Sequence, residues 1–336
     1  MRQYLPEIKA LKPDMILVLS HLGWDSELAL FEEFPEIDGI LGGHTHLVID
    51  PPAVVNGEHG HRFMSQPGEW GQYVTRYDIA LYRNSARRVE VLSAGLVAMS
   101  NEKPEDAAMA QSVLKLWQQI EDKVSTVLGT ARVFLNGERD YIRKMETNLG
   151  NLVTDCFADF AAADMSLING GGIRSSIATG SITVGDCLNV LPFDNYLVKI
   201  KLTGASLKKI FARVAEGISQ SGGFGGFLQV SRGMLVDYSQ SEVAVTLNGK
   251  ELIDEELYTV CTTDFLAAGG DGLTGFTEAV DSESTGKLTG DIFMSFIKSQ
   301  GSVAPVTEGR IKLMQTVNKI KMPKGIIKNI PTPPRD

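Results

Sequence analysis

The sequence predicts an α/β region followed by an α+β region, with one long helix between them. In the first part, continuous apolar runs alternate with helical patterns, as in sheets of buried parallel strands. A helical pattern then continues over residues 104–128. After about residue 130, strands and helices of ordinary length follow one another, and no internal repeat is visible.

Two apolar runs in the first region are predicted to be neighbouring parallel strands. They are "MILVLSH" at 15–21 and "DGILGGH" at 38–44, and the helical pattern "DSELALFEEF" at 25–34 separates them. Each run has the composition of a buried strand and ends in a histidine. His21 and His44 are therefore expected at the C-terminal edges of adjacent strands, where ligands of α/β sheets gather.

Three further segments of the first region have the alternating pattern of half-exposed strands. They are residues 62–66, 73–81 and 87–99. Only two buried strands precede residue 50, and two strands do not form a stable covered sheet by themselves. We therefore expect the chain to begin partway through a domain.

Residues 104–128 are predicted to form one helix that connects two domains. Pro104 lies near its start, acidic residues are expected in its first turn, and Gly129 is expected to end it. Its polarity suits a connector.

The second half has the element order of an α+β domain. Helices are expected at 146–162 and 205–219, strands at 164–169, 196–204 and 306–314, a glycine-rich turn leading into strands at 222–238, and a strand entering a loop at 257–272. The last twenty residues contain five Lys or Arg, four Pro and one Asp. We expect them to be a flexible basic tail.

Composition argues against several classes of protein. The net charge of −9 disfavours a nucleic-acid-binding surface, so an anionic ligand would need locally placed arginines. No apolar run approaches the roughly 18 residues that span a bilayer, and the N-terminus lacks an apolar signal-peptide core. The cysteines Cys156, Cys187 and Cys261 match no metal-binding pattern and are expected to be buried, inert thiols.

Three histidines are candidate metal ligands. His21 follows the first apolar run, and His44 and His46 form a Gly-Gly-His-x-His sequence after the second. The glycines allow a close approach of the backbone, and imidazole suits zinc, manganese and similar ions. His59 and His61 form another His-x-His pair, but they lie in a turn-rich stretch, where we expect a solvated loop.

A candidate anion site follows the strand that ends at Asn169. The sequence "NGGGIRSSI" places Arg174 on a glycine-rich turn, whose N–H groups and guanidinium suit an anion. Arg143, just before a helix N-terminus, is a second candidate cation. The alternatives are a tight structural loop for the glycine run and a surface ion pair for Arg143.

Two phenylalanines lie beside turns and polar residues, Phe193 in "LPFDN" and Phe265 in "TTDFLAAGGDG". Phenylalanine is usually a core residue, but two at loop edges can hold a planar base between them. Asp271, on the Gly-Gly turn after Phe265, is a candidate acceptor for sugar hydroxyls.

Together these segments resemble the 5′-nucleotidase family, which includes UDP-sugar hydrolases and cyclic-nucleotide phosphodiesterases. The resemblance covers nearly the whole chain to about residue 314. It rests on the sequences "SHLG", "GGHTH", "ETNLGNLVTD", "NGGGIRSSI", "ITVGDCLNVLPFDN", "GGFLQVS" and "DFLAAGGDG". It implies a binuclear metallophosphatase domain joined by a long helix to a C-terminal nucleotide-recognition domain.

The resemblance also implies roles for individual residues. His21, His44 and His46 match metal-ligand positions of the wider metallophosphoesterase class, although many relatives have glutamine or asparagine where His46 stands. The residues that match groups holding the nucleoside and its flanking anion or ribose are Arg143, Asn169 and Arg174. The residues that match the base-stacking pair and the ribose acceptor are Phe193, Phe265 and Asp271.

The chain departs from the family pattern in its first part. Family members begin with Asp-x-His, Gly-Asp and Gly-Asn-His-Asp/Glu segments, which supply other metal ligands, a bridging aspartate and a catalytic His/acid pair. No Asp-x-His or Gly-Asn-His sequence occurs here. We therefore expect an N-terminally truncated member with no catalytic residue of its own, whose histidines bind metal weakly and singly.

The expected organisation is an incomplete metallophosphoesterase α/β sandwich at 1–102, a linker helix at 103–129, a 5′-nucleotidase C-terminal α+β domain at 130–316 and the tail at 317–336. The expected chemistry of the complete protein is hydrolysis of nucleotide phosphoesters with two divalent ions, zinc, manganese or similar. This chain is expected to supply the substrate-binding domain and part of the metal site.

Several alternatives remain open. They are a non-catalytic nucleotide-binding module, a UDP-sugar or cyclic-nucleotide phosphodiesterase, and an incomplete fragment with an exposed apolar sheet edge near residues 15–20. The expected partner is a nucleotide or nucleoside, with no nucleic acid and no membrane span. The resemblance implies a periplasmic or cell-surface protein, and the preferred nucleotide and oligomeric state are left open.

Overall fold

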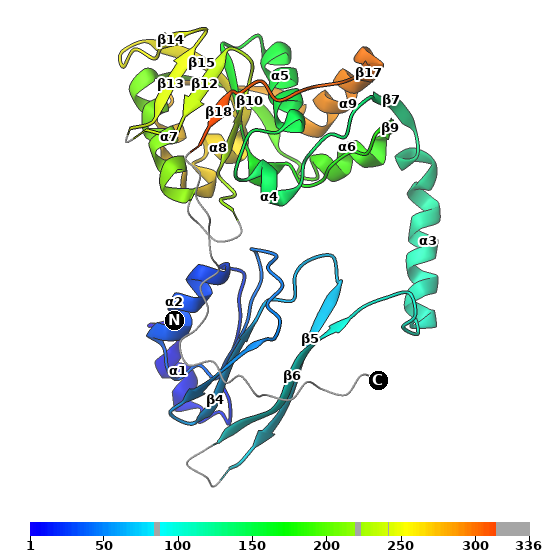
Figure 1. Ribbon diagram of the computed structural model, residues 1–336, viewed down its shortest axis with the longest axis vertical. Helices are drawn as coiled ribbons and strands as arrows, with labels where there is room; N and C mark the ends of the chain where they lie inside the picture. Colours follow the sequence, from blue (N-terminus) through cyan, green and yellow to red (C-terminus); the bar gives the residue numbers. More distant parts are fainter. Residues whose placement is uncertain (84–87, 219–222, 241, 314–336) are drawn as a thin grey trace. The chain divides into compact units, whose positions relative to one another are not determined.

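The computed structural model describes residues 1–83, 88–218, 223–240 and 242–313 (Figure 1). These residues form two compact units that meet in the sequence between Glu105 and Asp106. No helix within the described ranges is both long and apolar enough to cross a bilayer. The basic segment expected at residues 317–336, and the domain end expected at 316, lie outside the described residues.

The described part of the first unit is built on a six-stranded mixed sheet in the order β1-β2-β4-β6-β5, and β3 pairs with β4. The neighbours β1, β2, β4 and β6 are parallel, whereas β3 and β5 run antiparallel to their partners. The strands are β1 (Leu17–Leu19), β2 (Gly39–Leu41), β3 (Ala53–Gly57), β4 (Gly60–Ser65), β5 (Tyr73–Leu81) and β6 (Val89–Ala98), and the helices are α1 (Leu5–Ala10) and α2 (Trp24–Glu33). The predicted α/β character of this region is confirmed.

β4 is the central strand of this sheet and is buried on both faces. Met64 packs with Trp24 and Phe31 of α2, and its neighbour Phe63 packs with Val91 in a separate cluster. Successive side chains of a strand point to opposite faces, so the two clusters lie on the two sides of the sheet. The expectation of a half-exposed strand at 62–66 is therefore wrong, because helix α2 covers one face and β-strand side chains cover the other.

β1 is an edge strand and is not buried as predicted. It pairs with β2 on one side and with no other described strand. Leu19 is 88% exposed, and Leu17 is also exposed. An apolar sequence typical of an inner strand thus forms the edge of the sheet that the described residues build near 15–20, a position where pairing with another chain is favoured.

His61 lies inside β4 and is buried, so the solvated loop expected around it is wrong. Its Nδ1 accepts a hydrogen bond from the N–H of Val91 at 3.0 Å. The turn is confined to residues 58–59, because Gly57 already pairs with Gly60. The buried imidazole links two strands.

The described part of the second unit contains three sheets. The largest has the order β11-β8-β15-β10-β16, in which β8 and β15 are parallel and the other neighbours antiparallel; the smaller two are β14-β13-β12-β18 and β17-β7-β9. The strands are β7 (Val127–Ala131), β8 (Met165–Asn169), β9 (Gly180–Thr183), β10 (Tyr196–Thr203), β11 (Leu228–Val230), β12 (Met234–Asp237), β13 (Ala244–Leu247), β14 (Lys250–Glu251), β15 (Leu257–Thr263), β16 (Asp281–Leu288), β17 (Ser302–Val303) and β18 (Ile311–Lys312).

Helices and 3-10 turns connect these strands. They are α3 (Ala107–Val124), α4 (Arg139–Ile142), α5 (Asn148–Ala161), α6 (Val184–Val190), α7 (Gly204–Gly217), α8 (Asp264–Ala267), α9 (Thr289–Gln300), η1 (Gly170–Gly172), η2 (Gly270–Gly272) and η3 (Thr274–Glu278). The α+β order predicted for this half is confirmed.

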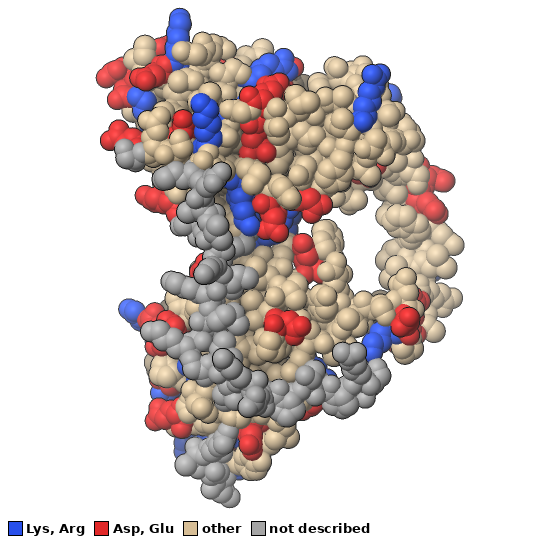
Figure 2. Space-filling view, viewed as in Figure 1, with Lys and Arg blue, Asp and Glu red and all other residues tan. Residues whose placement is uncertain are grey.

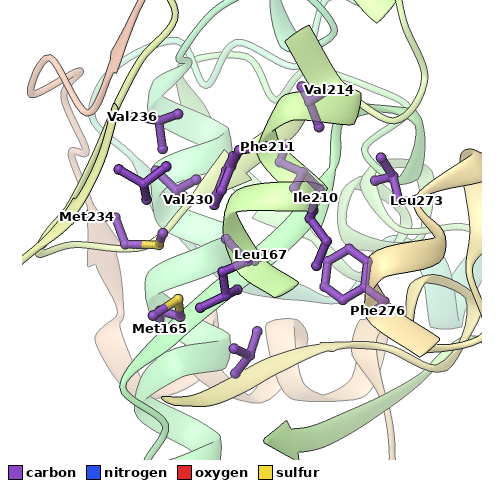
Figure 3. Close-up of a cluster of buried hydrophobic side chains, with 14 of the residues drawn as sticks. Met165, Leu167, Ile210, Phe211, Val214, Val230, Met234, Val236, Leu273 and Phe276 are labelled. Carbon is purple, nitrogen blue, oxygen red and sulfur yellow. The ribbon is translucent and has the colours of Figure 1, made fainter. Parts of the chain in front are cut away.

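The largest sheet of the second unit has a hydrophobic core on each face. On one face, Phe211 of α7 belongs to a cluster with Met165 and Leu167 of β8 (Figure 3). On the other, Ile168 of β8 belongs to a cluster with Phe157 of α5. β8 is therefore packed on both faces, and this packing holds the backbone of its last residue, Asn169, in place.

The long helix α3 is shorter than predicted. It begins after Asp106, whose side chain accepts a hydrogen bond from the N–H of Met109 at 2.8 Å, and it ends at Ser125. The acidic residues expected in its first turn precede it, and Gly129 lies inside β7 instead of ending the helix. The run from Val127 pairs with β9 and β17, which favours a strand over further helix.

The three thiols are expected to be unreactive in the folded chain. All are buried, and burial raises the pKa of Cys261 to about 11 and that of Cys187 to about 12. Burial also raises the pKa of Cys156 above its usual range. Because the thiolate is the reactive form, a disulfide reagent such as dithionitrobenzoate at pH 8 should label no cysteine before unfolding and all three in guanidinium. Fast labelling of any thiol in the native chain would contradict this burial.

Candidate functional site

Asn169 is the last residue of β8 and is buried where the strand enters the turn η1. Its Nδ2 donates a hydrogen bond to Oδ2 of Asp271 at 2.7 Å, across 102 residues of sequence. Asp271 lies in η2 with a left-handed φ of 54°, a conformation that is uncommon for a residue with a side chain. Two of the predicted ligand residues are therefore in direct contact.

The glycines of η1 allow three backbone segments to meet at this turn. The N–H of Gly170 donates to the carbonyl of Phe227 at 2.6 Å, and that of Gly171 donates to the carbonyl of Gly225 at 2.7 Å. A Cβ on Gly170 would lie 2.3 Å from the carbonyl oxygen of Ile142. No side chain fits in that space, so the glycine run is required by packing at the site and not only by a tight turn.

Arg143 reaches the site through the same contact. It directly follows α4, and its Cα lies 3.2 Å from the position that a Cβ on Gly170 would take. Surface charges of both signs are visible in Figure 2, and a surface ion pair would involve residues of this kind. Arg143, by contrast, is buried. The surface ion pair considered as an alternative for Arg143 is therefore wrong.

Arg174 and Phe193 form a second part of the site. Nη1 of Arg174 donates to the carbonyl of Gly171 at 3.5 Å, and its Cζ lies 6.0 Å from the centre of the Phe193 ring. That distance is at the outer limit of a cation–π contact. Phe193 is 48% exposed, and it lines a small pocket together with Gly172 and Asn195, among others.

Phe265 lies in α8, just before the glycine turn η2 that carries Asp271. A Cβ on Gly270 would be 2.4 Å from the Phe265 ring, so the ring packs closely against the backbone next to Asp271. The side chain is nevertheless 44% exposed. Phe193 and Phe265 are thus both surface rings, and the core position considered as an alternative is wrong for each.

A continuous series of contacts now links all six predicted residues of the second unit. It consists of Arg143 on Gly170, Asn169 on Asp271, Phe265 on Gly270, and Arg174 on both Gly171 and Phe193. Two exposed aromatic rings, two guanidinium groups and a carboxylate beside an amide are suited to a ligand with a planar ring, hydroxyl groups and an anion.

In the first unit, the parallel pairing of β1 and β2 brings two of the predicted metal ligands together. The ring centroids of His21 and His44 are 5.1 Å apart, with the rings edge to face at 73°. His44 has a left-handed φ of 73°. Such strained backbone is concentrated at functional sites, which favours a role for this loop beyond connecting strands.

His46 is not assembled with this pair. Its Nδ1 forms a contact with Oε2 of Glu69, a residue that the sequence analysis did not single out. Among the described residues, no group of three or more His, Cys, Asp or Glu side chains is placed to hold a metal ion. His21 and His44 therefore provide a pair of imidazoles, and the residues present do not fit a complete two-metal centre.

A buried polar network fixes the loop that carries His44. Oε1 of Glu27, on α2, accepts a hydrogen bond from the N–H of Gly43 at 3.1 Å, and its Oε2 accepts one from Nε2 of Gln66 at 2.6 Å. The same Nε2 donates to the carbonyl of Gly43 at 2.8 Å. Sequence analysis missed Glu27 and Gln66. The feature of the sequence that relates to Glu27 is the glycine at position 42. A Cβ there would lie 2.1 Å from the Glu27 side chain.

Comparison with known proteins finds related sequences and structures. The family model described as "5'-nucleotidase, C-terminal domain" matches residues 127–278. "Trifunctional nucleotide phosphoesterase protein YfkN" of Bacillus subtilis is 33% identical over 319 residues, and "Protein UshA" of Yersinia enterocolitica is 28% identical over 336 residues. The crystal structure of a 5′-nucleotidase precursor from Thermus thermophilus is similar, with 33% identity and a TM-score of 0.80.

These similarities cover most of this chain but only part of the relatives. The match with YfkN covers 90% of this chain and 21% of that protein, and the match with UshA covers 86% and 60%. The match with the Thermus structure covers 94% of this chain and 67% of that one. The chain therefore spans about three fifths of UshA and about a fifth of YfkN.

The close packing at η1 leads to a stability prediction. Replacing Gly170 with Ala should lower the free energy of unfolding by about 1–3 kcal/mol, because the new Cβ displaces the backbone at Ile142. Gly290→Ala in α9 is the control: its Cβ would make an ordinary 3.6 Å contact, and its effect should stay below about 1 kcal/mol. Denaturant unfolding of both variants measures the difference, and equal stabilities would disprove the close packing.

Proposed function

The chain belongs to the 5′-nucleotidase family, and we propose that its second unit recognises the nucleotide in a hydrolase of nucleotide phosphoesters. The observation that carries this proposal is the hydrogen bond between Asn169 and Asp271, in a unit where Phe193 and Phe265 are both exposed. In the proposal, Phe193 and Phe265 stack on the base. Asp271 accepts hydrogen bonds from ribose hydroxyls, and Asn169 orients its carboxylate.

The two arginines are assigned to the polar end of the ligand. Arg143 is buried against the glycine turn, so its charge acts in a region of lower dielectric than the surface. Arg174 is held by the carbonyl of Gly171 and lies near the Phe193 ring. Guanidinium groups in such positions favour a phosphate or a ribose oxygen over a neutral apolar group.

The same proposal gives His21 and His44 a role in binding a divalent ion, zinc, manganese or similar, whose chemistry in this setting would be to polarise a phosphoester. The pair alone does not fit a two-ion centre, so further ligands are required from outside it. No catalytic residue is proposed among the described ones.

A non-catalytic nucleotide-binding module is the second candidate function. The observation that favours it is that all six candidate ligand residues lie within the second unit and are linked by contacts inside it. UDP-sugars and cyclic nucleotides are further candidate substrates of the hydrolase, because stacking on phenylalanine does not depend on the identity of the base. A periplasmic or cell-surface location is part of the proposal.

Binding of AMP should depend on the Phe193 ring. Phe193→Ala should weaken AMP and adenosine binding by about tenfold or more, since base stacking on an aromatic side chain contributes about 1–3 kcal/mol. Phe160→Ala, at the far end of α5 and 49% exposed, is a matched control and should bind like the wild type. Isothermal titration calorimetry checks both, and equal affinities for Phe193→Ala and wild type would refute the stacking role.

Hydrolysis by this chain alone is expected to be at background. With manganese or zinc added, release of phosphate from AMP should not exceed the rate of buffer with metal, because two histidines without a bridging carboxylate hold an ion weakly. Phosphate release by purified protein is the measurement, with His44→Ala as the comparison. Robust turnover that His44→Ala abolishes would show that the chain contains a working centre.

A further inference from the structure

Gln229 is a fully buried polar side chain outside the six proposed ligand residues. It is the central residue of β11 and lies opposite Ile168 of β8. Its two neighbours in the strand, Leu228 and Val230, are apolar and buried. A buried amide between apolar residues destabilises the fold unless its polar atoms find partners, so its contacts identify what it is for.

Within the described residues, the three hydrogen bonds of its side chain all go to the backbone of one short segment. Nε2 of Gln229 donates to the carbonyl oxygen of Ile142 at 2.9 Å and to that of Met145 at 2.7 Å. Its Oε1 accepts from the N–H of Thr147 at 3.1 Å. One side chain therefore holds both ends of residues 142–147, the segment that joins α4 to α5 and contains Arg143.

The carbonyl oxygen that Gln229 holds at Ile142 is the one that packs against η1. A Cβ on Gly170 would be 2.3 Å from this oxygen and 3.2 Å from Cα of Arg143. β11 and β8 are also paired directly, with Leu228 opposite Asn169. A shift of the Gln229 amide would therefore move Arg143 relative to Asn169.

The first turn of α5 leaves space for this amide. A Cβ on Gly150 would lie 2.2 Å from Oε1 of Gln229 and 2.6 Å from its Cδ. Alanine is a better helix former than glycine, so helix propensity alone favours Ala at this position. The glycine is explained by the room that the Gln229 side chain needs.

We propose that Gln229 is a positioning residue that fixes Arg143 against the Asn169 turn and thereby sets the affinity of the site for its anionic ligand. This inference rests on the proposed function, in which Arg143 contacts the nucleotide. Gln229 itself is not assigned a contact with the ligand.

A double-mutant cycle with AMP tests the proposal. Gln229→Glu keeps the shape and the acceptor for Thr147, but it replaces the Nε2 donor with an oxygen atom that faces the carbonyl oxygens of Ile142 and Met145. Arg143 should therefore move, and AMP affinity should fall by about tenfold. In an Arg143→Ala background, Gln229→Glu should alter AMP affinity by less than about twofold, because the guanidinium group that Gln229 positions is absent. Gln111→Glu on the exposed helix α3 is the matched control and should bind like the wild type.

A purely structural role predicts a different result. Gln229→Glu would then reduce affinity by the same factor in both backgrounds, and that additivity would overturn the proposal. An Arg143→Ala variant that binds AMP like the wild type would overturn it as well.

Gly150→Ala provides a second route if the buried carboxylate prevents folding. Its methyl group pushes on the Gln229 amide without changing the amide chemistry, and it should also weaken AMP binding and be non-additive with Arg143→Ala. Unchanged AMP affinity in Gly150→Ala, with the chain folded by circular dichroism, would contradict the positioning role.

A crystal structure of the Gln229→Glu or Gly150→Ala chain separates this inference from the proposed function. If wild-type chain shows no AMP binding, the proposed function fails, while a displaced Arg143 in the variant structure still supports positioning. An unmoved 142–147 segment in that structure would overturn the positioning role regardless of ligand binding.

Discussion

Close approach of backbone to Gly170 and Gly171 is the constraint on which the candidate nucleotide site depends. The carbonyl of Ile142 comes in from one side, and the carbonyls of Gly225 and Phe227 accept hydrogen bonds from the turn. Each approaching segment brings a polar residue near the turn. The segment with Ile142 also carries Arg143, and the segment with Gly225 lies beside the side chain of Asp271. Because the contacts are with backbone, a methyl group added at Gly170 would displace the chain next to Arg143 and would also strain the turn after Asn169.

The two units fix their functional loops with the same physical device. In the first, the buried carboxyl group of Glu27 accepts a hydrogen bond from the backbone of the loop that carries His44. Gly42 has no side chain, and this provides the space that Glu27 occupies. In the second, the buried amide of Gln229 forms hydrogen bonds with the backbone of the segment that carries Arg143. Gly150 has no side chain, and this provides the space that Gln229 occupies. Satisfied buried polar groups hold a loop in one conformation, since leaving them unpaired would be strongly unfavourable.

Hydrophobic periodicity was sufficient to predict most strands and helices, but not their surroundings. The run containing Leu19 has the composition of an inner strand, and only the pairing of β1 shows that it is an edge. The predicted end of α3 lies too far along the chain, because the segment from Val127 forms a strand only through its pairing with β9 and β17. The six residues of the second unit came from motifs, whereas Gln229 and Glu27 act through long-range backbone contacts that spacing does not reveal.

In the proposed function, the linked residues around Asn169 and Asp271 bind a nucleotide, and a crystal structure of this chain with AMP is the most direct test of this binding. We expect the base to stack against Phe193 and Phe265, with a ribose hydroxyl within hydrogen-bond distance of Asp271. AMP bound elsewhere on the chain, or a structure at saturating AMP with these side chains contacting no ligand, would contradict it.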